Sequence, residues 1–427
     1  MEALFKIKEK GSSPGAEILA GLTSFLSVIC IIFVVPEILS ATGMPYTAVL
    51  VATCLACATG CFLTALISNL PLVRTPALGM SAFFAYSLCN QLGYTWPQAL
   101  TIVLISGALC AAAAFTPFRD IITSCIPEPL KKASLAGIGL FIAFIGLSAA
   151  GIVTTVDGRP GLGSLTSGNA LLAIIGLAVT SLLIAWKIKG AMFFGIIITS
   201  IIGIPLGVTG SFSPGFTNIN LSTFLLFDFK GILSGGIFPL IISIMTLCLF
   251  SMFSDKKPSC EADSDKEKTG KPAVDLTLLT NAVATCSGAV FGMPMVLTHD
   301  DTPEDEDEAG LTGFSSFAAG LFFLLAIPLA LFGRIVPGAA VFPVFVITGI
   351  RMLKSATDID WGEFETALPC FITIAATPFA YSIPHSLGMG LVFHTLIKLF
   401  RGKAKEVPVA VYIVTLIFIA FFIFPQK

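Results

Sequence analysis

The sequence predicts an all-α polytopic membrane protein, and its composition, its apolar runs and its charge distribution carry that prediction. Hydrophobic residues make up 55% of the 427 positions and charged residues only 12%, against roughly 25% charged in a soluble domain. Apolar runs of about twenty residues recur, which is the length a helix needs to cross a bilayer core. A β-barrel would instead show short alternating segments. Because unpaired backbone groups cannot face lipid, we expect helices.

Two sets of apolar spans follow one another along the chain. The first set is predicted near 17–38, 46–69, 76–90, 98–116, 130–152, 170–186 and 191–207. The second set is predicted near 231–253, 273–291, 295–310, 311–333, 337–353, 366–383 and 385–400. An extra apolar stretch, 407–425, closes the chain and is a candidate for a further helix.

Basic residues sort to one side of these spans. With the N-terminus in the cytoplasm, the outside connections keep only Arg159, Lys230 and Arg334. The inside segments then hold Lys6, Lys8, Lys10, Arg119, Lys131, Lys132, Lys187, Lys189, Lys256, Lys257, Lys266, Lys268, Lys271, Arg351, Lys354, Arg401, Lys403 and Lys405. This split follows the positive-inside rule. We therefore expect a multi-pass protein of the cell (inner) membrane with a cytoplasmic N-terminus.

The two sets resemble each other as an internal duplication. IPEPLKKASLAGIGLF (126–141) has a counterpart in IVPGAAVFPVFVITGI (335–350), and 182–198 resembles 378–394. Seven spans per unit is an odd number, so the second unit must enter from the opposite face, as in the 7+7 inverted repeats of secondary transporters. The predicted organisation is a first repeat at 1–210, a connecting helix and charged cytoplasmic linker at 211–272 (which includes span 231–253), the rest of the second repeat at 273–400 and an extra C-terminal helix at 401–427.

Each set contains a short span interrupted by proline or glycine. The breaks are Pro71, Pro76 and Gly79 within 69–86, and Gly292 and Pro294 within 287–310. Such breaks expose helix N-terminal amides, which can pair with an acceptor on a solute, and transporters of this kind bind solute there. The alternative is a pair of helices that merely kink. The matched positions favour a solute site where the two segments meet.

The main group of ionisable residues follows the second break. Intramembrane carboxylates are costly and usually functional, and His299, Asp300 and Asp301 come directly after the apolar GMPMVLT stretch. We therefore take Asp301 as a candidate for solute binding, and all three as candidates for proton coupling. Glu304–Glu308 is better explained as a solvated acidic loop.

Other residue types do not point to a metal, a cofactor or an enzyme. Cys54, Cys57 and Cys61 share one helix face, and packing of small residues between helices explains them better than metal binding. We expect His385 and His394 to be structural. The sequence holds no HExxH pattern, and its GxSxG match, GSSPG (11–15), lies in the polar N-terminal segment rather than after a predicted strand, so it does not indicate a nucleophile. Its net charge is −2, which gives no reason to expect a nucleic-acid partner.

A distinctive set of segments extends over nearly the whole chain. It comprises 5–45, AGIGLFIAFIGLSAAGIV (136–153), 358–383, GMSAFFAY (79–86) and the spacing from GMPMVLTHDD to AGLTG. These segments resemble the nucleobase–cation symporters, in the branch of the adenine, guanine and hypoxanthine permeases. The resemblance implies a core domain, formed by the first four helices of each repeat. The resemblance further implies that this core moves in an elevator-like manner against a gate domain of the last three helices, with a purine between them.

The resemblance also implies site residues. The third helix of the family reads like GLNAFFAY, which places its polar Asn on Ser81, beside Ala82 and Phe83. The base-binding Glu of its tenth helix falls on Asp301, and Thr298 lies just before it. We expect Ser81, Asp301 and, from the eighth helix, Cys248 and Ser251 to line one cavity near the membrane midplane, with Ser81 and Asp301 within about 15 Å of each other.

The eighth helix departs from the family. Its DLFDT-like motif corresponds to TLCLFSMFS (246–254), so that Cys248 and Ser251 stand where carboxylates are expected. A carboxylate accepts two strong hydrogen bonds from a purine's N–H edge, whereas a serine hydroxyl offers a weaker one and a thiol hardly any. Cys248 and Ser251 remain candidate solute-binding residues, but the substrate and the proton coupling no longer follow from this helix.

The sequence therefore predicts a purine nucleobase permease, with proton symport as a possibility. Three alternatives stay open: a transporter of a different small solute, an anion transporter, and a degenerate paralogue or sensor that does not transport. The anion alternative is disfavoured because neither broken segment holds a cation except Arg74, at the edge of the first. The expected partners are a small nucleobase, the bilayer and, for coupling, protons; a homo-oligomer is also open.

Overall fold

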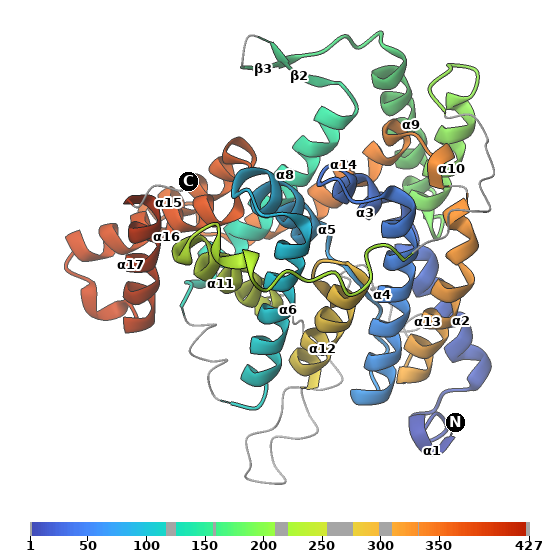
Figure 1. Ribbon diagram of the computed structural model, residues 1–427, viewed down its shortest axis with the longest axis horizontal. Helices are drawn as coiled ribbons and strands as arrows, with labels where there is room; N and C mark the ends of the chain where they lie inside the picture. Colours follow the sequence, from blue (N-terminus) through green and yellow to red (C-terminus); the bar gives the residue numbers. More distant parts are fainter. Residues whose placement is uncertain are drawn as a thin grey trace.

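The protein is described from a computed structural model (Figure 1). It describes residues 2–116, 125–156, 159–209, 221–253, 276–298, 310–331 and 333–423. The first repeat contains α1 (Glu2–Phe5), α2 (Pro14–Val28), α3 (Ile31–Ser40), α4 (Tyr46–Ile67), β1 (Arg74–Pro76), α5 (Leu78–Ala82), the π-helix η1 (Phe83–Gln91), α6 (Trp96–Ala113), α8 (Glu128–Ala149), β2 (Val153–Val156), β3 (Arg159–Leu162), α9 (Gly168–Ala185) and α10 (Ala191–Gly203).

The second repeat follows a similar order in the described residues, with the short helix η6 where the first repeat has the β2–β3 hairpin. It contains the 3-10 helix η2 (Gly231–Leu233), α11 (Ile237–Phe253), α12 (Leu276–Phe291), β4 (Val296–Thr298), α13 (Gly313–Leu325), η4 (Ile327–Leu331), η5 (Gly333–Ile335), α14 (Gly338–Leu353), η6 (Lys354–Asp358), α15 (Phe364–Ala380) and α16 (Ile383–Phe400). After it come η7 (Ala404–Glu406) and α17 (Val409–Ile423), so the predicted apolar stretch 407–425 does form a helix.

Most of the predicted spans are apolar helices in the described residues. Seven described helical stretches are both long and apolar enough to cross a membrane, and the remaining apolar helices are shorter. Two details differ from the prediction. The first span is interrupted between α2 and α3 near Ile29 and Cys30. The span predicted as a helix at 295–310 begins as an extended strand, β4, because Gly292 adopts a left-handed φ of 95° and Pro294 cannot continue a helix.

The helices form two groups, which are the expected core and gate domains. In the core, α4 packs against α12 and α13, α2 against α13, and α6 against α11 and α12. In the gate, α8 packs against α14 and α15, α9 against α10 and α14, and α15 against α16. In Figure 1 the gate helices α15, α16 and α17 lie at the left and α9 and α10 at the upper right. Each domain thus combines helices from both repeats.

The gate contains the clearest trace of the duplication. Both α8 and α14 begin directly after a proline N-cap, Pro127 and Pro337. Gly139 and Gly349 follow these caps at the same distance along each helix, and the two glycines meet where the helices cross. A Cβ on either glycine would lie 2.6 Å from the carbonyl oxygen of the other. The predicted correspondence of 126–141 with 335–350 therefore agrees with the structure to within one residue, since Pro127 matches Pro337 and Gly139 matches Gly349. The crossing depends on the absence of side chains.

A hairpin that the hydropathy did not predict connects α8 to α9. Strands β2 and β3 pair antiparallel from Val153 opposite Leu162 to Val156 opposite Arg159. In Figure 1 the hairpin projects beyond the helices at the top. The apolar run of α8 ends before it, so these residues connect two spans without being part of either.

The extra helix α17 belongs to the gate but also reaches the core. Its Phe418 ring fills the space over Gly388 of α16, where a Cβ would lie 2.5 Å from the ring. Val411, Val414 and Phe418 share a hydrophobic cluster with Ile242 of the core helix α11. The connection before α17 is held by Glu365, a buried carboxylate contacted by three cations: Lys398, Arg401 and Lys403. The helix is thereby anchored to α15 and α16 and lies against α11.

Candidate solute site

The two broken segments meet in a short antiparallel strand pair at the centre of the core. Strand β1 pairs with β4 so that Arg74 lies opposite Thr298, Thr75 opposite Leu297 and Pro76 opposite Val296. The backbone amide of Ala77, which follows β1, donates to the carbonyl of Met295 at 3.1 Å. The predicted meeting of the two segments is therefore confirmed. It is built by strands, because proline and glycine interrupt the helices at matched points.

Helices α4 and α12 approach the crossing strands from the two repeats in equivalent ways. Each does so through a glycine: a Cβ on Gly60 would lie 2.9 Å from the Arg74 Cβ, and one on Gly288 would lie 2.6 Å from a Val296 methyl. Each helix also donates a hydrogen bond to a strand carbonyl. The Cys61 thiol of α4 donates to the carbonyl of Arg74 at 3.8 Å, and a threonine hydroxyl of α12 donates to the carbonyl of Val296 at 3.1 Å. The crossing thus has approximate two-fold symmetry.

Arg74 lies inside this crossing. Its side chain is fully buried; Nε donates to the Thr64 hydroxyl of α4 at 3.0 Å and Nη1 donates to the Thr298 hydroxyl of β4 at 2.5 Å. Thr298 in turn donates to the Asn281 side-chain carbonyl of α12 at 3.5 Å. Arg74 precedes α5 and so lies at the edge of the broken helix, as the sequence indicated, but its burial inside the crossing was not anticipated. An arginine directly before Thr-Pro in an apolar segment was the signal that could have indicated its position.

The predicted site residues of the first segment are buried beside the crossing. Ser81, Ala82 and Phe83 are all fully buried where α5 continues into η1. The Ser81 hydroxyl donates to the carbonyl of Ala77 at 3.0 Å, so its hydrogen is directed to the N-cap of its own helix. No side chain caps α5, since its N-cap is an alanine. Thr298, from the second segment, is partly buried on the other strand.

Asp301, Asp300 and His299 lie outside the described residues. The distance expected between Ser81 and Asp301 therefore remains a prediction. The same holds for the part played by these three side chains in proton coupling.

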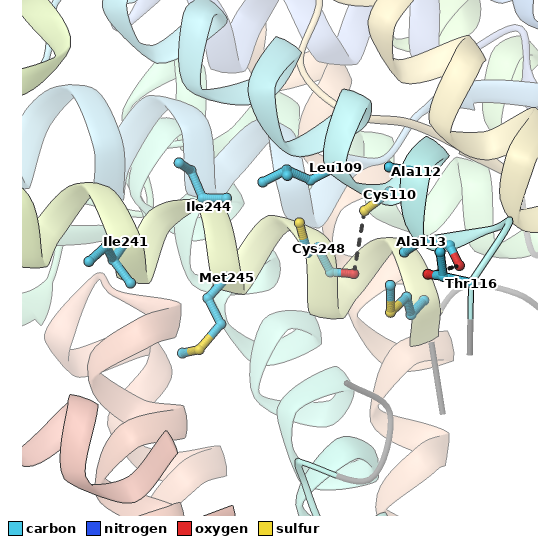
Figure 2. A pocket seen from close by; sticks show the side chains of 10 residues that line it. Leu109, Cys110, Ala112, Ala113, Thr116, Ile241, Ile244, Met245 and Cys248 are labelled. Atoms are coloured by element: carbon cyan, nitrogen blue, oxygen red, sulfur yellow. Dashed lines mark hydrogen bonds between the residues drawn. The ribbon is translucent and has the colours of Figure 1, made fainter. Parts of the chain in front are cut away.

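Cys248 and Ser251 of α11 are placed against another helix of the core. The Cys248 thiol donates to the carbonyl of Ser106 in α6 at 3.6 Å, and the Cys110 thiol of α6 points back to the carbonyl of Cys248 at 4.0 Å (Figure 2). An apolar cavity of about 640 Å³ opens between these two helices. Ser251 is buried one turn further along α11. The structure thus brings Ser81 and Thr298 to the strand crossing, and directs Cys248 to the interface of α6 and α11.

A contact between core and gate was not anticipated from the sequence. The Ser87 hydroxyl of η1 donates to the carbonyl of Tyr381 at 3.0 Å, and Tyr381 adopts a left-handed φ of 50° in the turn between α15 and α16. Its ring packs edge-on against Phe141 of α8, with centroids 5.6 Å apart, and lies near Tyr86 of η1. His385 follows in α16 and packs beside the aromatic residues of α17.

Comparison with known proteins gives the family. The profile described as "Permease family" matches residues 15–357. This chain belongs to the permease family. The permease is 34% identical to a putative permease of Methanocaldococcus jannaschii, covering 99% of this chain and 98% of that protein. It is 32% identical to a guanine/hypoxanthine permease of Bacillus subtilis (99% and 100% covered) and 30% identical to an adenine permease of Escherichia coli (99% and 96% covered). The resemblance to nucleobase permeases is confirmed.

Solved structures similar to the permease show the same fold at low sequence identity. The transmembrane domain of a cyanobacterial bicarbonate transporter has a TM-score of 0.64 at 16% identity and covers 87% of this chain and 96% of that chain. A structure of SLC26A9 has a TM-score of 0.66 at 12% identity, covering 94% of this chain and 68% of that chain. The 7+7 inverted repeat with core and gate domains is confirmed by these neighbours.

Proposed function

We propose that this permease carries purine nucleobases of the adenine, guanine or hypoxanthine type across the cell membrane. The observation that carries the proposal is the pairing of β1 with β4, which brings the broken segments of both repeats together at the core. Relatives that align over nearly the whole chain are adenine and guanine/hypoxanthine permeases. The solute would lie beside this crossing, near Ser81 and Thr298, and the core would carry it past the gate in an elevator-like movement.

Proton symport is part of the same proposal and depends on a different group. Of the candidate coupling residues, Asp301 is favoured, because it stands where the family places a base-binding Glu and follows the strand that pairs with β1. A carboxylate removed from water favours its protonated form, so it can bind and release a proton during each cycle. The proposed orientation has the N-terminus in the cytoplasm, as the distribution of basic residues indicates.

A second candidate function is transport of a different small solute. The observation in its favour is the eighth helix, in which Cys248 faces α6 and Ser251 supplies a hydroxyl where the family has carboxylates. A solute with fewer N–H donors than a purine would need no carboxylate from this helix.

Uptake by purified protein in proteoliposomes tests both functions. Radiolabelled adenine, guanine, hypoxanthine and uracil would be offered with and without an inward proton gradient. We expect saturable uptake of at least one purine, competed by unlabelled purines but not by uracil. Absence of purine uptake by well-folded protein would overturn the proposal and favour the second candidate.

The coupling group is tested by a pair of variants. Asp301→Asn is expected to abolish accumulation driven by the proton gradient while leaving exchange of labelled for unlabelled solute. Asp301→Glu, which restores the residue of the family, should be the milder change. If Asp301→Asn accumulates solute as the unmodified protein does, Asp301 is not the coupling group.

A further inference from the structure

The strand crossing needs more than its backbone to hold its register. Strands β1 and β4 pair over only three residues each, and a two-stranded ladder of this length is marginal by itself. A slip by one residue would turn every side chain to the opposite face. Ser81 and Thr298 would then no longer keep their positions relative to each other. Side chains that join the strands must therefore contribute to the register.

Arg74 is the side chain that makes those connections. A fully buried arginine is rare unless its charge and its donors are satisfied. Here Nε is bonded to Thr64 of α4 and Nη1 to Thr298 of β4. Thr298 continues the chain of hydrogen bonds to Asn281 of α12. These hydrogen bonds therefore connect the first repeat, through both strands, to the second repeat.

The geometry of the guanidinium matters for this role. Arginine presents donors in a rigid planar fork, so that Nε and Nη1 can reach two fixed acceptors on different elements. A lysine carries a single ammonium group on a flexible stem. It keeps the charge but cannot hold both hydroxyls in one fixed arrangement. The bond to Thr298 is charge-assisted, and such bonds are roughly twice as strong as neutral ones.

We propose that Arg74 is a positioning residue for transport, which sets the register of β1 on β4 and thereby places Ser81 relative to Thr298. The residue acts through Thr64 and Thr298 and makes no contact with the solute in this role. The functional part of the proposal rests on the proposed function, since it assumes that solute binds beside the crossing. The structural part of the proposal, that Arg74 sets the register of the strands, does not depend on the proposed function.

A cross-link measures the register without any substrate. Thr75 and Leu297 are directly opposite in the ladder, and opposite residues have Cβ atoms about 4.5–5.5 Å apart. Cysteines at both positions should form a disulfide when copper–phenanthroline is added as oxidant, detected as a linked peptide by mass spectrometry. Adding Arg74→Met should reduce the yield severalfold. Adding Arg74→Lys should give an intermediate yield. An undiminished yield with Arg74→Met would overturn the proposal.

Kinetics of uptake separate positioning from a merely structural role. In single variants, Arg74→Lys and Thr298→Val should raise KM by about tenfold, the change expected when a charge-assisted hydrogen bond is lost. The amount of folded protein should stay near that of the unmodified permease. The two changes combined should cost little more than either alone, because both remove the same bond. Thr180→Val, which removes a buried hydroxyl bonded within α9 of the gate, is the control and should leave KM unchanged.

The outcomes distinguish this proposal from the proposed function. If Arg74→Met does not fold, Arg74→Lys and Thr298→Val still carry both measurements. A reduced cross-link in a protein that takes up no purine would support the register and overturn only the purine assignment. An unchanged KM with an unchanged cross-link in Arg74→Lys and Thr298→Val would overturn the positioning role.

Discussion

Among the described contacts between the repeats, two are crossings of equivalent elements, β1 with β4 and α8 with α14, and they are built differently. In the core, β1 and β4 meet around a buried arginine, with side-chain hydrogen bonds to α4 and α12. In the gate, α8 and α14 meet at Gly139 and Gly349 with backbone against backbone. The first crossing depends on polar groups of particular geometry, and the second on the absence of side chains.

The difference follows from what each crossing must do. Strands leave backbone groups unpaired at their ends, and within a bilayer those groups need partners inside the protein, so the core crossing is rich in hydroxyl, thiol and amide groups. Helices satisfy their own backbone. Small residues then let them pack closely, which is how helices associate in membranes. We therefore expect the gate crossing to be sensitive to volume and the core crossing to polar substitutions.

The largest effect is expected from Gly349→Leu in the gate. Its Cβ would lie 2.6 Å from the backbone oxygen of Gly139 and 3.0 Å from the Ala143 side chain, and a backbone atom cannot move aside. The free energy of unfolding should fall by about 3 kcal/mol, the upper part of the usual range for overpacking. Thermal melting in detergent, followed by size-exclusion chromatography, measures it. Gly15→Leu, at a helical glycine with open space around it, is the control; equal effects of the two would contradict the comparison.

A smaller effect is expected from Gly288→Ala in the core. The new Cβ would lie 2.6 Å from a methyl group of Val296, which is a side-chain atom that can be removed. The loss of stability should be about 1–2 kcal/mol. The double variant with Val296→Ala should recover part of it, measured by the same melting curves. Absence of any recovery would mean that the clash is with the strand backbone, as in the gate.

Ser87→Ala tests the contact between the two domains. It removes the hydrogen bond from η1 to the carbonyl of Tyr381, which contributes about 1 kcal/mol and thus about a fivefold change in a conformational equilibrium. The rate of uptake should change by no more than that factor, while melting should hardly change. Ser27→Ala removes a hydrogen bond within α2 and should not alter the rate. A clear drop in melting temperature with an unchanged rate of uptake would show that the contact is only structural.

The smallest effect concerns Asp228, in the connection that precedes α11. The backbone amide of Gly231 and the side-chain amide of Gln98 hold the pKa of this carboxyl below its ordinary value. A lowered pKa in the folded state contributes stability above the unfolded pKa, and this contribution is lost as the pH falls through the folded pKa. Melting temperatures should therefore fall as the pH drops below about 4, the ordinary pKa of an aspartate, and Asp228→Asn should reduce that fall. Glu406 is the counterpart in the gate, because Lys398 lowers the pKa of its carboxyl. Glu406→Gln should therefore also reduce the fall in melting temperature at low pH.

Hydropathy was sufficient to predict where the helices lie in the sequence, and the prolines and glycines located the interrupted segments. The correspondence of α8 with α14 could be found because both begin after a proline and carry a glycine at the same place. The strand pair was not predictable, since three residues in an apolar stretch have no local signature of a ladder. The position of Arg74 required the partner strand, which lies more than two hundred residues away in the sequence.

The side of α11 on which Cys248 lies could not be predicted either. A helix that is apolar all round gives no indication of which face meets which neighbour. The contact of Ser87 with Tyr381 depends on the docking of two domains and on a left-handed residue in a turn. Such features arise from tertiary packing, which the sequence of one segment does not contain.

The helix α17 has a consequence for the energetics of the cycle. An inverted duplication makes the two halves interchangeable, so the inward-open and outward-open states of an ideally symmetric carrier would have equal free energies. Among the described helices, α17 has no equivalent after α10, and its apolar residues contact both α16 of the gate and α11 of the core. If the core moves past the gate as we propose, one state buries more of the surface of α17 than the other. The helix would then remove the degeneracy of the two states and give the resting permease a preferred side.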